Sequence, residues 1–297
     1  MTDIATTPAV ARTARSEAMR RALFRFRQSK LSIVGAVMVF LVLFFTAFGG
    51  LLAPYPEHVA GGVDTANRFL APSVGHPFGT NELGQDVLSL VMAGTTVSVA
   101  AGFAVVLIGT LIGTTVGAIA GFNGGWIDEV LMRLSDLMLT IPGLILAMAV
   151  AAALGPGFVN MILAISLSWW PGYARLVRGE VISAREEVYV SAARAIGASP
   201  ARVLFRHILP NIVSPVIVKM SLDMGFAILT VAALGFIGIG VRPPTPEWGT
   251  LLSISRSYMP DFWWTAIFPG LAMFLAVFGF NLLGDGLRDV LDPRARR

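Results

Sequence analysis

Long uncharged blocks dominate the order of hydrophobic and polar positions along the chain. Because a helix rises 1.5 Å per residue, it needs roughly 20 apolar residues to cross about 30 Å of hydrocarbon. Six segments meet this requirement, and they lie at residues 31–53, 95–121, 130–154, 158–176, 212–235 and 262–284. The pattern therefore predicts an all-α, polytopic membrane protein with six transmembrane helices.

The third and fourth segments belong to a single uncharged run. No charged residue occurs between Asp136 and Arg175, and Gly155-Pro156-Gly157 interrupts the run near its middle. Since Gly and Pro in this combination break a helix, they predict the turn of a helical hairpin. A shorter apolar stretch at residues 87–93 precedes the second segment, and we expect it to lie along the membrane surface as an interfacial helix.

Polar segments divide the rest of the chain. The pattern predicts an N-terminal tail at residues 1–30, an external loop with the interfacial helix at residues 54–94, and a C-terminal tail at residues 285–297. Residues 95–284 then form the core, which contains an Arg-rich polar loop at about residues 186–210.

The composition agrees with a membrane protein. Of the 297 residues, 55% are hydrophobic and 13% are charged, whereas a soluble domain carries about 25% charged residues. The chain contains no cysteine, which excludes a disulfide scaffold and thiol chemistry. A net charge of +4 and a pI near 9.9 would also suit a nucleic-acid partner, so the location of the basic residues has to decide.

The basic residues lie mostly on one side of the predicted membrane. Eighteen Lys and Arg residues fall in the two tails, in the segment between the second and third helices and in the segment from Arg175 to Arg206. The opposite side has only Arg68, Arg242 and Arg256. Because cytoplasmic loops retain positive charge, we expect both termini and the 186–210 loop in the cytoplasm, and no nucleic-acid partner.

No catalytic motif is found in the sequence. A phosphate-binding loop needs a lysine after a Gly-rich turn, but the only lysines, Lys30 and Lys219, follow Ser29 and Val218. The external histidines His58 and His76 are either a metal site or, on the simpler interpretation, solvated loop residues. We therefore predict no enzyme activity and no cofactor on this chain, so any energy source for this membrane protein has to come from elsewhere.

Two sets of residues stand out within the predicted helices. Gly109, Gly113, Gly117 and Gly121 recur every four residues, which favours close helix packing and leaves a sliding surface as the alternative. Lys219 and Asp223 share one helix face and can neutralise each other, as a structural pair or as part of a substrate or ion site. Asp136, near Arg133, is open to the same two interpretations.

The loop at 186–210 predicts two short helices. Residues 186–196 have good helix propensity, Ala192 and Ala193 allow another surface to approach closely, and Gly197 can end the helix in the left-handed conformation. A second helix is expected from Pro200 to Pro210. Two short amphipathic helices on one side of a membrane bundle are typical of a segment that inserts into a partner's groove.

This loop resembles the EAA loop of ABC importer permeases. The resemblance rests on the stretch from Ala192 to Gly197 and on Leu209-Pro210 after it. The family usually has Glu where this chain has Ser191. By this resemblance the contact with the ATPase is made by Tyr189, Ser191, Ala192, Ala193, Arg194, Gly197, Leu209 and Pro210.

Further stretches resemble the dipeptide, oligopeptide and nickel importers within that family. Residues 76–86 are similar to the signature before the second helix, with Asn81 and Gln85 where the family usually has Asp and Arg. Residues 234–249 and 281–293 also agree. Together these stretches are most similar to the C-type permease subunit.

The resemblance implies a type I ABC importer permease fold and an assembly. It implies a homologous B-type permease, two ABC ATPase subunits that bind ATP and Mg²⁺, an external substrate-binding protein, and a location in the lipid of a bacterial or archaeal cytoplasmic membrane. Dipeptides or oligopeptides are the expected cargo, with nickel, glutathione, sugars or opine-like compounds as alternatives. Outside this class, an ion-coupled secondary transporter would need buried acids at matching positions of two halves, and a channel would not need the loop.

Overall fold

Helices make up nearly all of the ordered structure in the computed structural model, which describes residue 24 and residues 27–291. In that part of the chain there is no β-strand, only an isolated bridge between Thr80 and Asp86. The α-helices are α2 (Lys30–Leu52), α3 (Pro56–Val59), α4 (Val87–Asn123), α5 (Gly125–Thr140), α6 (Gly143–Leu154), α7 (Phe158–Arg185), α8 (Val188–Ala195), α9 (Pro200–Arg202), α10 (Val213–Ile237), α11 (Trp248–Ser255) and α12 (Trp264–Leu291). The shorter helical turns are η1 (Thr65–Asn67), η2 (Val203–Ile208), η3 (Leu209–Asn211) and η4 (Arg256–Tyr258). The all-α prediction is confirmed.

Four helices are long and apolar enough to cross a membrane, namely α2, α4, α10 and α12. The pair α5 and α6 makes a fifth span if the two are counted together. Helix α7 has 28 residues, but its second half carries Arg175, Arg178 and Arg185, and it is not among the four. The number of six spans therefore stays a prediction.

The expected interfacial helix at residues 87–93 is not a separate element. It is the beginning of α4, a single helix of 37 residues that starts at an N-cap, where the Asp86 side chain accepts a hydrogen bond from the Ser89 amide. No proline interrupts α4, so the hydrogen-bond ladder continues through the predicted boundary. At 1.5 Å per residue the helix is about 55 Å long, which exceeds the hydrocarbon thickness.

The predicted third span is broken in two. Helices α5 and α6 meet at an angle of 90°, because Pro142 disfavours the helical conformation for the residue before it and Ile141 is extended. The turn of the hairpin, by contrast, lies at residues 155–157, where the sequence predicts it, with Gly155 at a φ of 82°.

The last helix extends past its predicted end. The sequence places residues 285–297 in a tail, but α12 runs to Leu291. The polar residues Asp285 and Arg288 end the apolar pattern without breaking the helix, since neither removes a backbone hydrogen-bond donor.

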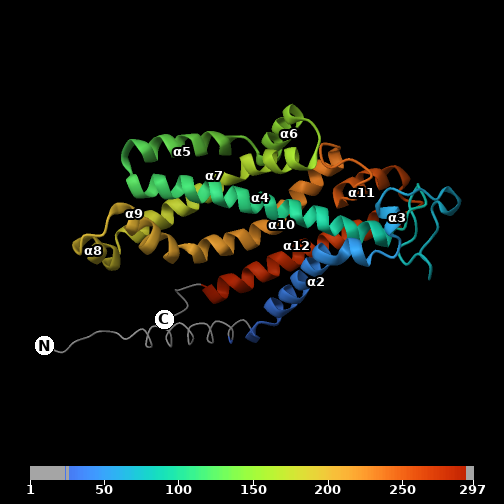
Figure 1. The fold of residues 1–297 in the computed structure, drawn as a ribbon, viewed down its shortest axis with the longest axis horizontal. Coiled ribbons are helices and arrows are strands. Elements are labelled where there is room, and N and C mark those ends of the chain that lie inside the picture. The colour runs from blue at the N-terminus through green and yellow to red at the C-terminus, as the bar shows by residue number, and fades with distance from the viewer. Residues whose placement is uncertain (1–23, 25–26, 292–297) are drawn as a thin grey trace.

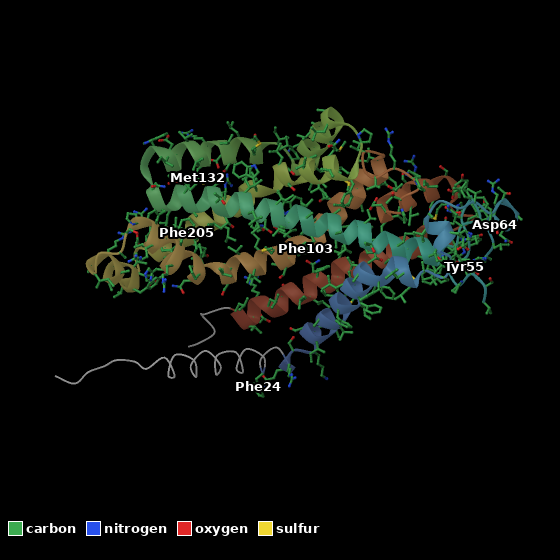
Figure 2. The ribbon with its side chains drawn as sticks, in the orientation of Figure 1. Phe24, Tyr55, Asp64, Phe103, Met132 and Phe205 are labelled. Atoms are coloured by element: carbon green, nitrogen blue, oxygen red, sulfur yellow. The ribbon has the colours of Figure 1, made fainter. Side chains whose placement is uncertain are left out.

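Helix α4 runs through the centre of the bundle beside α7 and α10, with α2 and α12 on one side and α5 on the other (Figure 1). Helices α8 and α9 lie at one end of the molecule, and α3 and α11 lie at the opposite end (Figure 1). Figure 2 shows the same two ends through labelled side chains, with Phe205 near α8 and α9, and Tyr55 and Asp64 at the far end.

The glycine stripe of α4 lies against α7. A Cβ added at Gly113 would lie 2.5 Å from the Trp170 carbonyl oxygen, and one added at Gly121 would lie 2.8 Å from the Arg178 carbonyl oxygen. Gly117 faces the Ala174 carbonyl, and Gly109 faces the Trp169 side chain. The bare backbone thus lets the two helices approach more closely than any larger residue would permit.

Candidate functional site

The site expected from the sequence is built around α8, an eight-residue helix with a well-defined end. Gly197 has a φ of 83°, and its amide donates to the Arg194 carbonyl oxygen at 2.9 Å. The Ala198 amide donates to the Ala193 carbonyl oxygen at 3.0 Å. These two bonds form a Schellman motif, so the left-handed cap predicted at Gly197 is confirmed.

One face of α8 holds it against the rest of the protein. Val190 and Ala193 are buried and belong to a hydrophobic cluster with Val177 and Val181 of α7. Ile208 of η2 completes this contact. Because α8 is packed on the end of α7, a displacement of α8 has a direct route into the bundle.

Ala192 and Ala193 have different environments. Ala192 is exposed and free to contact another protein, whereas Ala193 points into the chain's own core. Of the other residues predicted for the ATPase contact, Leu209 is half-buried, and the exposed ones are Tyr189, Ser191, Arg194, Gly197 and Pro210.

The exposed face of this region carries apolar side chains that the sequence reasoning missed. Val188, Ile196 and Phe205 are 81%, 86% and 68% exposed, and Figure 2 labels Phe205 at this end. These apolar residues lie in a loop that is otherwise rich in arginine, and this contrast is the feature of the sequence that could have identified them. Exposed apolar groups rimmed by charged residues mark protein interaction surfaces, and we call these three residues with Tyr189 the apolar cap.

The second arm of the site is helical but not a regular α-helix. After α9, residues 203–208 form the π-helix η2, in which the Leu209 amide donates to the Leu204 carbonyl oxygen five residues back. Pro210 follows at once and has no amide to continue an α-helical ladder. Residues 209–211 then form the short helix η3, and α10 begins at Val213, so this arm joins the apolar cap to α10.

The predicted ion pair on α10 is present. Lys219 Nζ lies 3.0 Å from Asp223 Oδ2 and 4.9 Å from the ring centroid of Tyr173 on α7. The buried hydroxyls of Tyr173 and Thr110 have no hydrogen-bond partner in the described structure. The contact of Lys219 with Tyr173 thus connects α10 with α7, about two turns after the start of α10.

Asp136 has a different partner from its sequence neighbour Arg133. It lies 2.6 Å from Arg175 of α7, while Arg133 pairs with Glu129. Arg178 makes two further bonds to Asp128, at 2.5 and 2.6 Å. These contacts across 39 and 50 residues fasten α5 to α7.

The opposite end of the bundle contains the two unusual amides of the 76–86 segment. Asn81 Nδ2 donates to Gln85 Oε1 at 2.9 Å, and Gln85 Nε2 donates to the Gly62 carbonyl oxygen at 2.9 Å. A neutral amide pair therefore occupies the positions of the family's usual Asp and Arg, and joins the loop to the start of α4.

The external histidines are structural rather than solvated. His58 is buried, and its Nδ1 accepts the Asp86 amide at 3.0 Å. His76 Nδ1 lies 2.9 Å from the Asp86 carboxylate, and the Tyr55 ring stacks on both imidazoles. The solvated-loop interpretation is wrong, and the described residues contain no group of three or more side chains able to hold a metal ion.

Comparison with protein-family models matches residues 113–297 to the binding-protein-dependent transport system inner membrane component. Residues 18–72 match the N-terminal transmembrane domain of oligopeptide transport permease C. Together the two matches include α2, the end of α4 and all helices from α5 to α12, with the α8 site among them.

Several curated proteins are similar over nearly the whole chain. The probable D,D-dipeptide transport system permease protein DdpC of Escherichia coli K12 is 44% identical, covering 92% of this chain and 91% of its own. The dipeptide transport system permease protein DppC of Alkalihalophilus pseudofirmus is 42% identical, covering 93% and 90%. The glutathione transport system permease protein GsiD of Escherichia coli O6:K15:H31 is 42% identical, covering 92% and 89%.

Among solved structures, a chain of the inward-facing MetNI methionine ABC transporter has the same fold. The TM-score is 0.54 at 17% sequence identity, and the match covers 68% of this chain and 96% of that one. This similarity supports the type I permease architecture.

Proposed function

Because this chain belongs to the binding-protein-dependent inner-membrane transport components and is the permease subunit of an ABC importer, we propose that it carries dipeptides or short oligopeptides into the cell. The cargo assignment is supported by relatives that are named for dipeptides and are more than 40% identical over nine-tenths of the chain. Glutathione, the cargo named for another relative, is itself a tripeptide-like compound and is the second candidate. Nickel and other small solutes are the remaining alternatives.

The apolar cap is the observation that supports coupling to an ATPase. In the isolated chain Val188, Ile196 and Phe205 are exposed to water. Docking into an apolar groove would remove the unfavourable free energy of hydrating these side chains. Two ATPase subunits bind ATP and Mg²⁺ and dock one permease each, through α8 of this chain and the matching helix of a B-type partner. No ATP site on this chain is required.

The proposed motion follows from how the site is attached. Closure of the ATPase dimer moves α8, which pushes on α7 through Val190 and on α10 through η2 and η3. Rigid-body movement of packed helices then exposes the path to an external binding protein. ATP can bias this equilibrium only by the difference between its affinities for the two states.

The orientation follows the distribution of basic residues. The α8 end, which carries Arg194, Arg202 and Arg206, faces the cytoplasm, where ATP is available, and the α3–α11 end faces outward. Both termini lie in the cytoplasm, in a bacterial or archaeal cytoplasmic membrane.

The docking proposal predicts that Ile196→Asp releases the ATPase subunits. Burying an isoleucine contributes roughly 1.5–3 kcal/mol, so we expect at least a tenfold loss of ATPase copurified with the membrane complex. The matched control is Val74→Asp, since Val74 is also fully exposed but lies in the loop at the opposite end. Equal ATPase recovery from both variants would contradict the docking site.

The cargo proposal is tested by uptake in cells that lack other peptide importers. Labelled dipeptide, tripeptide, glutathione and nickel are supplied separately at matched membrane levels of wild-type and Ile196→Asp protein. We expect peptide uptake that the variant loses. Wild-type uptake of nickel alone would contradict the peptide assignment and leave the ABC mechanism in place.

A further inference from the structure

A cleft of about 280 Å³ lies at the α3–α11 end of the bundle, and its lining is mostly apolar with a few polar side chains. One wall is the segment that leads into α4, represented by Asn81, Glu82 and Gln85. The other wall is the loop before α11, with Pro243, Pro244 and Pro246, and the side of α11 itself. Segments about 160 residues apart in the chain therefore form one site.

Most of the polar groups in this cleft are already occupied by the fold. Asn81 and Gln85 are bonded to each other. Glu247 is completely buried, and its carboxylate accepts hydrogen bonds from the Ser98 hydroxyl and from the Gly249 and Thr250 amides at 2.8 to 3.1 Å. These groups hold the walls in place and have little capacity left for a ligand.

Glu82 is the exception. It is half-buried and forms no ion pair with any residue in the described part of the chain. Burial raises the pKa of the Glu82 carboxyl above its usual value, while a hydrogen bond from its own backbone and the charge of Arg68 lower it in part. Glu82 also lines a small second cavity next to the N-terminal part of α12. A positive charge that entered the cleft would therefore offset the cost of the poorly solvated carboxylate.

The surroundings of Glu82 favour one kind of cation. A divalent metal ion would need several oxygen ligands, and the described residues include no group of three or more His, Cys, Asp or Glu side chains that could hold one. A single carboxylate beside apolar proline rings suits a primary ammonium group carried on a short organic chain. The cleft is slightly smaller than the usual 300–1,000 Å³ of a ligand pocket, so it has room for the end of a peptide rather than for the whole molecule.

We propose that this cleft is an entry site in which Glu82 receives the charged amino terminus of the incoming peptide. The proposal rests on the proposed peptide cargo and deepens it, because it selects peptides by a free α-amino group. That group has a pKa of about 7.7–8.0 and is mostly charged at neutral pH. The α11 loop would hold the first residue of the peptide, and Glu82 would hold its ammonium.

The test compares a free peptide with its N-acetylated form. The maximal uptake rates of labelled Ala-Ala and acetyl-Ala-Ala are measured in proteoliposomes with the complete importer, at concentrations that saturate the binding protein. We expect wild type to prefer the free peptide, and Glu82→Gln to lower that preference about tenfold, the size of one charge-assisted hydrogen bond. Glu82→Asp is expected to restore part of the preference. Glu57→Gln is the control, since Glu57 is an exposed glutamate at the same end, outside the cleft.

Three results would overturn the proposal. Unchanged uptake of both peptides in Glu82→Gln would remove Glu82 from recognition. An equal loss of both substrates would mean that Glu82 contacts the binding protein instead. An equal effect of Glu57→Gln would mean that only the general surface charge matters. If wild-type importer transported neither peptide, the proposed function itself would fail, and these outcomes are distinguishable from that one.

Discussion

At the scale of single residues, backbone conformation and burial explain the two positions on which the proposals depend most. Gly197 adopts a left-handed conformation in open space, so only its φ and no neighbouring atom restricts a substitution there. At Glu82 the side chain and not the backbone is the costly part, because burial removes water from its carboxyl and raises the pKa of that group. A residue with a Cβ at position 197 therefore strains the backbone, whereas a neutral residue at position 82 removes the cost of burying a charge.

Gly197→Ala is predicted to weaken coupling. A left-handed conformation costs a residue with a Cβ roughly 1–2 kcal/mol, so the end of α8 would loosen and peptide-stimulated ATP hydrolysis would fall. Gly197→Asn is the control, because asparagine tolerates this conformation better. We expect the ATPase rate of reconstituted complexes to fall in the order wild type, Gly197→Asn, Gly197→Ala. Equal rates for the two variants would contradict the role of the left-handed helix end at Gly197.

The raised pKa of the Glu82 carboxyl predicts that the stability of the protein depends on pH. Because its pKa is raised in the folded state, its contribution to stability is present below the unfolded pKa and is lost as the pH rises through the folded pKa. Glu82→Gln should therefore have a higher Tm than wild type at pH 7.5, with the difference shrinking toward pH 4. Thermal unfolding in detergent measures this, and a Tm difference independent of pH would contradict the burial of the carboxyl.

At the scale of elements, some helix boundaries depend on residues next to them in the chain, whereas others depend on how the helices pack. The start of α4 at Asp86 and the end of α8 at Gly197 depend on capping residues that can be recognised in the sequence. The break between α5 and α6 depends on Pro142, a local signal that lies inside a long uncharged run and is hidden by the apolar pattern on both sides. The pairing of Asp136 with Arg175 had no local signal, because it depends on how α5 packs on α7.

The close contact of α4 with α7 predicts opposite effects for two glycines. Gly117→Ala would press a methyl group into the α7 backbone, and overpacking of this kind costs typically 1–3 kcal/mol. Gly179→Ala, on α7 with open space around it, should be neutral or stabilising by up to about 1 kcal/mol, because alanine is the better helix former. Thermal stability of the purified variants checks the contrast, and equal Tm values would contradict the close approach.

At the scale of the whole molecule, the two ends of the bundle have different chemistry. The α8 end presents the apolar cap among arginines, and the α3–α11 end presents a packed loop with a cleft that contains Glu82. This difference between the two ends suits a protein that contacts ATPase subunits on one side of a membrane and receives its substrate on the other.

The absence of cysteine makes the orientation directly measurable. We predict that Val74→Cys reacts with a membrane-impermeant maleimide in intact spheroplasts, and that Ile196→Cys reacts only after the membrane is permeabilised. Both side chains are highly exposed in the isolated chain. The chain is therefore expressed without ATPase subunits, so that docking cannot shield Ile196 and accessibility to the reagent depends on the side of the membrane. The opposite labelling pattern would reverse the topology and place α8 on the side of the membrane away from the ATPase subunits.

Apolar runs and local backbone chemistry were enough to predict the membrane class, both ends of α2 and α10 to within two residues, and the left-handed end of α8 at Gly197. They did not predict the full lengths of α4, α7 and α12, because charged or polar residues end an apolar pattern without ending a helix. The sequence also indicated the family through short motifs, without identifying the side of α8 that is exposed. The tertiary structure decided that Ala193 faces inward while Ile196 faces out, that Asp136 pairs with Arg175, and that Glu82 lies in a cleft closed by the α11 loop. Those contacts join residues far apart in the chain, and helix packing brings them together without leaving a periodic signal in the sequence.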